Sequence, residues 1–103
     1  MPKICRDGDL GKTGHLCHRY IGVIASQRSV LANGIPFARR GDRAKFHTIL
    51  RRCGKYPCCL PHKSKINRGS TTVFAEGIGV ARVWDSFDKA WMVRGSDNVF
   101  AGG

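Results

Sequence analysis

The sequence predicts a small all-β domain built from short hairpins, and three observations favour that class. The chain has 103 residues and 13 glycines, well above the average share of about 7%, which favours a turn-rich β protein over a helical bundle. Asn33-Gly34 lies between two short apolar runs and is the strongest short-range hairpin signal. A long segment also recurs along the chain. At this length we expect one domain over residues 1–103.

The recurring segment covers residues 26–42 and returns 43 residues later as residues 69–85, with seven of 17 aligned positions identical. A shorter copy, residues 95–103, matches the second copy at six of nine positions. We therefore expect two complete hairpin units and a final half unit.

The elements follow from these units. Asn33-Gly34 predicts the turn of the first hairpin, and Glu76-Gly77 occupies the same place in the second. Residues 20–25 and 63–66, which precede the two units, have room for another short strand each. No segment is convincingly amphipathic as a helix, although residues 44–52 could form a single helical turn.

The formal net charge is +11, and most of the excess lies in residues 39–68, where Asp42 is the only acidic residue. Such a field attracts phosphates, acidic proteins or anionic lipids. It fits either a solvated face or a nucleic-acid footprint. No apolar run is long enough to span a membrane. The N-terminus lacks the apolar run of a signal peptide, so we expect synthesis in the cytoplasm.

The residues that could bind a metal flank the first unit: His15, Cys17, His18, His47, Cys53, Cys58, Cys59 and His62. Four nitrogen and sulfur ligands make a tetrahedral structural zinc site, and the spacing Cys59-Leu60-Pro61-His62 could chelate one ion. Five cysteines, an odd number, and cytoplasmic synthesis disfavour a full disulfide framework, although one bridge could form after export. No Ser-His-Asp order, carboxylate pair or phosphate-binding loop indicates an enzyme.

These motifs together resemble the PAAR-repeat proteins, which sharpen the tip of the type VI secretion spike and of the central spike of contractile-tailed phages. Residues 33–42 carry the family's Asn-Gly turn, Pro-Ala-Arg-like strand and closing Gly-Asp, and residues 77–85 repeat them more loosely. Residues 95–102 are typical of the last strand, and Gly14-His15-Leu16-Cys17 is similar to the opening motif. The resemblance covers residues 8–103. It departs at Val83-Trp84-Asp85, where the family has Val-Gly-Asp.

The resemblance implies a cone of short strands with a structural zinc ion near the apex, held by three histidines and one cysteine, with iron as a substitute metal. His15 corresponds to the histidine of the opening motif. His47 matches the histidine after the first Gly-Asp, and His62 matches the one before the second unit.

The fourth ligand is where the sequence departs from the family. Asp88 stands where members often place the cysteine, seven residues before the last Gly-Ser. We therefore expect the thiolate to come from Cys59, because of its short link to His62, or else from Cys17. Asp88 is a lower-ranked oxygen ligand.

The resemblance also implies a function. The chain is expected to be a non-catalytic, membrane-piercing tip that caps a trimeric β-helical central spike, with one monomer per trimer. It would belong to a virion tail baseplate, which we favour, or to a type VI secretion spike. The bacterial outer membrane would be its target, and no specific nucleic acid its partner. The competing hypothesis is a small basic zinc-stabilised nucleic-acid-binding protein.

The docking base of such a tip would come from adjacent apolar residues at equivalent places in the three copies. In each pair, one residue should face the core and the other the base or the outside, and the sequence leaves open which. The pairs are Val30 and Leu31, Val73 and Phe74, and Val99 and Phe100.

Overall fold

The computed structural model describes residues 1–13, 17, 19–88 and 90–103. In this part of the chain, ten short strands pair into five antiparallel two-stranded sheets, and no helix occurs. No described segment is therefore a helix long and apolar enough to cross a membrane. The predicted all-β class with short hairpins is confirmed.

Each complete repeat unit forms one hairpin: β3 (Leu31–Ala32) pairs with β4 (Ile35–Pro36), and β7 (Phe74–Ala75) pairs with β8 (Ile78–Gly79). Asn33 and Gly34 have φ angles of 57° and 76°. Glu76 and Gly77 have φ angles of 50° and 80°. Positive φ at both central residues is the pattern of a type I′ turn, whose twist matches that of the flanking strands. The Asn33-Gly34 turn forms as predicted.

The half unit at the C-terminus is completed by the N-terminal residues 3–9, which the sequence analysis did not anticipate. Lys3 forms a β-bridge with Phe100, and the backbone N–H of Ile4 donates to the Val99 carbonyl at 2.9 Å. In sequence, Arg6-Asp7-Gly8-Asp9 stands where the first unit has Arg39-Arg40-Gly41-Asp42. The two chain ends therefore make the third unit together.

A ring of three backbone hydrogen bonds joins the units. The N–H of Cys5 donates to the Ala81 carbonyl, that of Ala81 to the Ala38 carbonyl, and that of Ala38 to the Cys5 carbonyl. The N···O distances are 2.9, 2.8 and 2.9 Å. Because each unit donates to one neighbour and accepts from the other, the chain has pseudo-threefold symmetry.

Two further hairpins lie beside this ring: β1 (Leu10–Lys12) pairs with β2 (Tyr20–Gly22), and β9 (Ser86–Phe87) pairs with β10 (Ala90–Trp91). The strand expected within residues 20–25 is thus present as β2. The strand expected over residues 63–66 is reduced to isolated bridges at Lys65 and Ile66. A Cβ at Gly11 of β1 would overlap the ring of Phe87, so glycine lets this aromatic core residue pack against the β1 backbone.

The longest hairpin joins β5 (His47–Cys53) to β6 (Tyr56–His62). It pairs in register from His47 opposite His62 to Cys53 opposite Tyr56, and Gly54, with a φ of 61°, lies in the turn. The helical turn considered for residues 44–52 does not form. A continuous ladder of cross-strand pairs satisfies the backbone of these residues, and β-branched Thr48 and Ile49 favour a strand.

The apolar core divides into two clusters. One contains Cys5, Val23, Ala38, Ile66, Ala81, Phe87 and Met92, and the other contains Ile4, Ala32, Phe37, Ala75, Val80 and Ala101. Val30, Val73 and Val99 pack against the second cluster. Their neighbours remain exposed, at 50% for Leu31, 55% for Phe74 and 44% for Phe100. The first residue of each pair therefore faces the core and the second faces outward.

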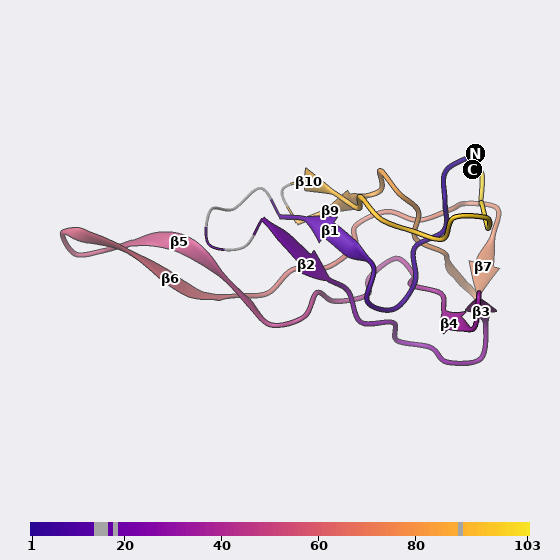
Figure 1. Cartoon of the computed structure of the whole chain (residues 1–103), viewed down its shortest axis with the longest axis horizontal. Coiled ribbons are helices and arrows are strands. Elements are labelled where there is room, and N and C mark those ends of the chain that lie inside the picture. The colour runs from indigo at the N-terminus through magenta and orange to yellow at the C-terminus, as the bar shows by residue number, and fades with distance from the viewer. Residues whose placement is uncertain (14–16, 18, 89) are drawn as a thin grey trace.

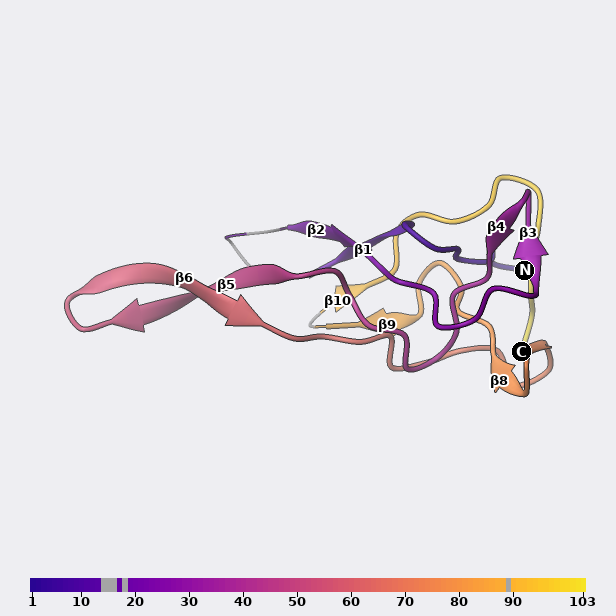
Figure 2. The same ribbon diagram turned by 90° about the horizontal axis from the view of Figure 1, so that it is seen from below.

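The molecule is elongated, measuring 48 × 23 × 21 Å. Both termini and the hairpins of the repeat units lie at one end, and the β5–β6 hairpin projects from the other (Figures 1 and 2). The two ends of the molecule therefore differ: the three repeats build a broad end, and a single hairpin forms the narrow end opposite.

Candidate metal centre

Three potential metal ligands meet at the base of the projecting hairpin: His47, His62 and Asp88. One ligand atom from each lies within 4.8 Å of the other two. The Asp88 Oδ1 atom is 3.2 Å from His62 Nε2, and the Asp88 Oδ2 atom is 3.4 Å from His47 Nε2. The side chains of His47 and Asp88 are almost fully buried, and His62 is largely buried.

Strand pairing explains why the two histidines meet. His47 begins β5 and His62 ends β6, and the two residues are directly opposite in the register. Opposite residues of an antiparallel pair point to the same face, and the ring centroids are 5.1 Å apart, with planes at 82°. Asp88 follows β9 in the left-handed conformation, with a φ of 54°. Its carboxylate therefore joins the β9–β10 hairpin to the base of the β5–β6 hairpin.

The orientation of the His47 ring suits metal binding. His47 Nδ1 lies 3.0 Å from the carbonyl oxygen of Lys45. A carbonyl oxygen can only accept, so Nδ1 carries the hydrogen, and in the neutral ring Nε2 presents its lone pair on the side of Asp88. A backbone carbonyl on the second ring nitrogen is the usual way in which proteins orient a metal-binding histidine.

The spacing of the ligand atoms fits a small divalent cation. Zinc binds imidazole nitrogen at about 2.0–2.1 Å and carboxylate oxygen at about 2.0–2.2 Å, so tetrahedral ligand atoms lie about 3.4 Å apart. The N–O separations to Asp88, 3.2 and 3.4 Å, match that value. Two imidazoles and one carboxylate suit zinc and also iron(II). The structure thus brings together a group that could hold a metal ion, and two of its three members, His47 and His62, are among the predicted ligands.

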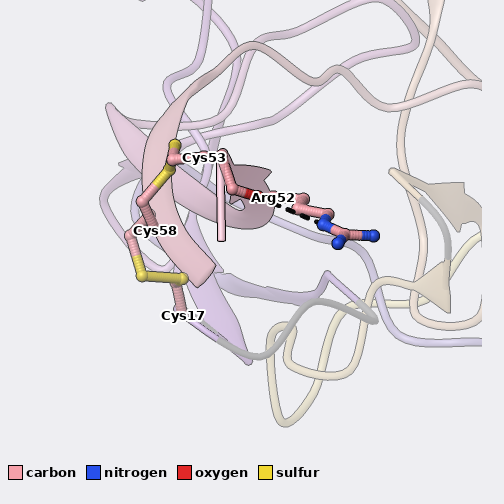
Figure 3. Close-up of a disulfide and its surroundings, with 6 residues drawn as sticks. Cys17, Arg52, Cys53 and Cys58 are labelled. Carbon is pink, nitrogen blue, oxygen red and sulfur yellow. Dashed lines mark hydrogen bonds between the residues drawn. A yellow bond between two sulfur atoms is a disulfide. The ribbon is translucent and has the colours of Figure 1, made fainter. Parts of the chain in front are cut away.

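Cys59 does not join them, contrary to the sequence-based expectation. Its sulfur is bonded to that of Cys17, with the two Cα atoms 6.1 Å apart (Figure 3). The reason is strand alternation: Cys59 and His62 are three residues apart in β6 and therefore point to opposite faces of the hairpin. A spacing that chelates a metal in a turn cannot do so in a strand. A sulfur in a disulfide also offers no thiolate, so neither Cys59 nor Cys17 is a ligand in this structure.

A second disulfide joins Cys53 to Cys58 across the hairpin, with the Cα atoms 5.8 Å apart (Figure 3). The expectation that at most one bridge forms was therefore wrong. The odd cysteine is Cys5, which is buried and free. Desolvation by burial raises the pKa of the Cys5 thiol far above its usual value, so this sulfur stays protonated.

The remaining predicted ligand, His15, lies outside the described residues, as does His18. Asp88, which the sequence analysis ranked below both cysteines, is the residue that the structure brings to the histidines. Its position in the sequence indicated this role, because Asp88 stands seven residues before Gly95-Ser96, where the family resemblance implies a ligand.

Comparison with protein families and with curated sequences gives no relative from which a function could be transferred. No protein-family model and no curated protein sequence matches this chain.

Proposed function

We propose that this chain is the structural tip of a contractile injection machine, seated as a single copy on a trimeric central spike and stiffened by a metal ion. The observation that carries the proposal is the ring of hydrogen bonds that joins Cys5, Ala38 and Ala81. A monomer with three equivalent sectors suits a threefold partner, because it presents a similar surface to each of the three subunits.

In this proposal the broad end is the docking base. Leu31, Phe74 and Phe100 occupy equivalent positions in the three units, and each leaves about half of its side chain exposed. Exposed apolar residues grouped at one end of a molecule often mark a protein interaction site. Their threefold arrangement favours a partner that has three matching apolar surfaces.

The metal would serve a structural purpose at the other end. The β5–β6 hairpin lies beyond both core clusters, and a two-stranded hairpin alone is at best marginally stable. His47 and His62 would hold the ion from the hairpin and Asp88 from the β9–β10 turn, with His15 as a fourth candidate from the sequence. Bound zinc supplies directional bonds worth about 10–16 kcal/mol in zinc-finger peptides. These bonds would stiffen a region too narrow for an apolar core.

The docking proposal is tested by native mass spectrometry of the chain mixed with the trimeric spike protein of the same source. We expect one chain per trimer, and we expect the triple variant Leu31→Asp, Phe74→Asp, Phe100→Asp to abolish the complex. Phe46→Asp is the control, because it introduces the same residue at an exposed phenylalanine that lies next to β5, away from the broad end. Three chains per trimer, or loss of the complex in the control alone, would contradict the proposal.

A further inference from the structure

The β5–β6 hairpin carries positive charge, and its own sequence contains no acidic residue. Residues 43–75 contain eight Lys and Arg and no Asp or Glu. Three of these cations, Arg51, Arg52 and Lys55, are exposed around the turn that ends the hairpin. The hairpin projects from the end opposite the three repeat units (Figures 1 and 2). The part of the molecule farthest from the proposed docking base is therefore a cationic tip.

Apolar side chains accompany this charge. Leu50 and Leu60 are exposed, and Tyr56 keeps 75% of its surface accessible. A shallow surface hollow brings the two kinds of side chain together, and its lining consists of Leu50, Arg51, Arg52, Lys55, Tyr56 and Pro57. Exposed leucines on a solvent-facing strand contribute nothing to the core. Exposed apolar side chains beside cations and a tyrosine match a surface that is both anionic and apolar.

The hairpin is also fixed in shape before it meets a partner. The Cys53–Cys58 disulfide crosses it near the turn, and the Cys17–Cys59 disulfide ties β6 to the segment before β2. A rigid element loses less conformational entropy on binding than a flexible loop. The cations and apolar side chains are therefore presented together with a smaller ordering cost.

We propose that the β5–β6 hairpin is a binding element for an anionic lipid bilayer, with Arg51, Arg52 and Lys55 contacting headgroups and Tyr56, Leu50 and Leu60 entering the interface. Each Lys or Arg near an anionic surface strengthens binding roughly fivefold. Tyrosine favours the headgroup level because its ring is apolar and its hydroxyl polar. This inference rests on the proposed function in one respect, that the narrow end faces the target membrane.

The test is co-sedimentation of the intact, oxidised chain with vesicles of phosphatidylcholine alone or mixed with phosphatidylglycerol. We expect binding only to the anionic vesicles. The variant Arg51→Gln, Arg52→Gln, Lys55→Gln should bind on the order of a hundredfold more weakly, since three charges are lost. The control Arg28→Gln, Arg40→Gln, Arg68→Gln removes the same net charge from exposed sites outside the hairpin and should bind nearly as well as the parent.

The apolar contribution is tested separately with Tyr56→Ser, Leu50→Ser, Leu60→Ser, which keeps all charges. This variant should lose the binding that persists at high salt, because salt screens only the electrostatic part. Thermal melting of each variant checks that it is folded, so that a loss of binding is distinguished from a loss of fold.

Three results would overturn the inference: equal loss in both charge variants, equal binding to neutral vesicles, or binding to duplex DNA without binding to anionic vesicles. The last would favour the nucleic-acid hypothesis. None of these results affects the complex with the spike trimer, which uses Leu31, Phe74 and Phe100. The failure of the lipid inference is therefore distinguishable from the failure of the proposed function.

Discussion

Equivalent residues of the three units make the same local contacts even where their identities differ. The backbone N–H groups of Arg6, Arg39 and Arg82 each donate to an aspartate Oδ2 three residues later, always at 2.8 Å. One position before each arginine is a buried residue of the hydrogen-bonded ring, either Cys5 or an alanine. The only chemical difference at that ring position is therefore one sulfur atom.

The ring predicts that Cys5 serves as a small apolar residue and not as a reactive thiol. Cys5→Ala should change the free energy of unfolding by less than about 1 kcal/mol, because Ala38 and Ala81 fill the equivalent places. Cys5→Leu should cost about 1–3 kcal/mol or more through overpacking. Urea unfolding monitored by circular dichroism measures both. Comparable losses in the two variants would mean that the sulfur itself matters.

The metal centre predicts a specific ranking of ligand variants. Asp88→Ala or His47→Ala should weaken zinc binding by at least tenfold, because each removes a proposed ligand. Cys59→Ser should leave zinc binding nearly unchanged, because its side chain points to the other face of β6 and is bonded to Cys17. Competition with a chromogenic zinc chelator measures all three. If Cys59→Ser releases zinc and Asp88→Ala does not, a thiolate site would replace the carboxylate site described here.

At the scale of elements, the hairpin disulfide makes a prediction about protease sensitivity. Arg51, Arg52 and Lys55 are exposed trypsin sites close to the Cys53–Cys58 bridge. Cys53→Ser, Cys58→Ser should raise the rate of tryptic cleavage in the hairpin, because local opening precedes cleavage. We expect an increase of about tenfold, equivalent to about 1.4 kcal/mol of lost local stability. Cleavage sites are identified by mass spectrometry, and cleavage at Arg28 provides the internal control.

A comparison of two hairpins shows how far the sequence could predict the fold. In the β3–β4 hairpin, Asn33-Gly34 predicted the turn because the backbone conformation is a local property of these two residues. Residues 44–52 have weaker local signals, since Phe46, Ile49 and Leu50 fit one helical turn as well as a strand. Once β6 is a strand, alternation separates Cys59 from His62 and leaves the cysteine free to bond Cys17. The preference for Cys59 rested on its short spacing to His62 without any assignment of residues 59–62 to a strand, and the strand is what separates the two side chains.

The closure of the third unit was missed for a different reason. Residues 3–9 and 95–103 lie at opposite ends of the chain, and no local pattern states that they pair. The contacts that join them include the Ala101 N–H donating to the Pro2 carbonyl at 3.0 Å. A repeat search detects copies that are contiguous in sequence, and here the third copy is divided between the two termini.

At the scale of the whole molecule, this closure predicts that the position of the chain ends is not essential but that residues 3–9 are. Deleting residues 1–9 should prevent folding, because Ile4 and Cys5 leave the two core clusters and the Ala38 N–H loses its acceptor. A circular permutant that joins Gly103 to Met1 through a short Gly/Ser linker and opens at Gly54-Lys55 keeps every one of these contacts.

We expect this permutant to fold, with a free energy of unfolding within about 2 kcal/mol of the parent. The termini lie at the same end of the molecule (Figure 1), and lengthening a flexible loop adds little closure entropy. The new ends would lie in an exposed turn beyond the core and stay linked by the Cys53–Cys58 bridge. Thermal unfolding of the deletion variant and of the permutant decides the matter. A folded deletion variant would mean that the other two units complete the core without residues 3–9. The threefold symmetry on which the docking proposal rests would then be contradicted.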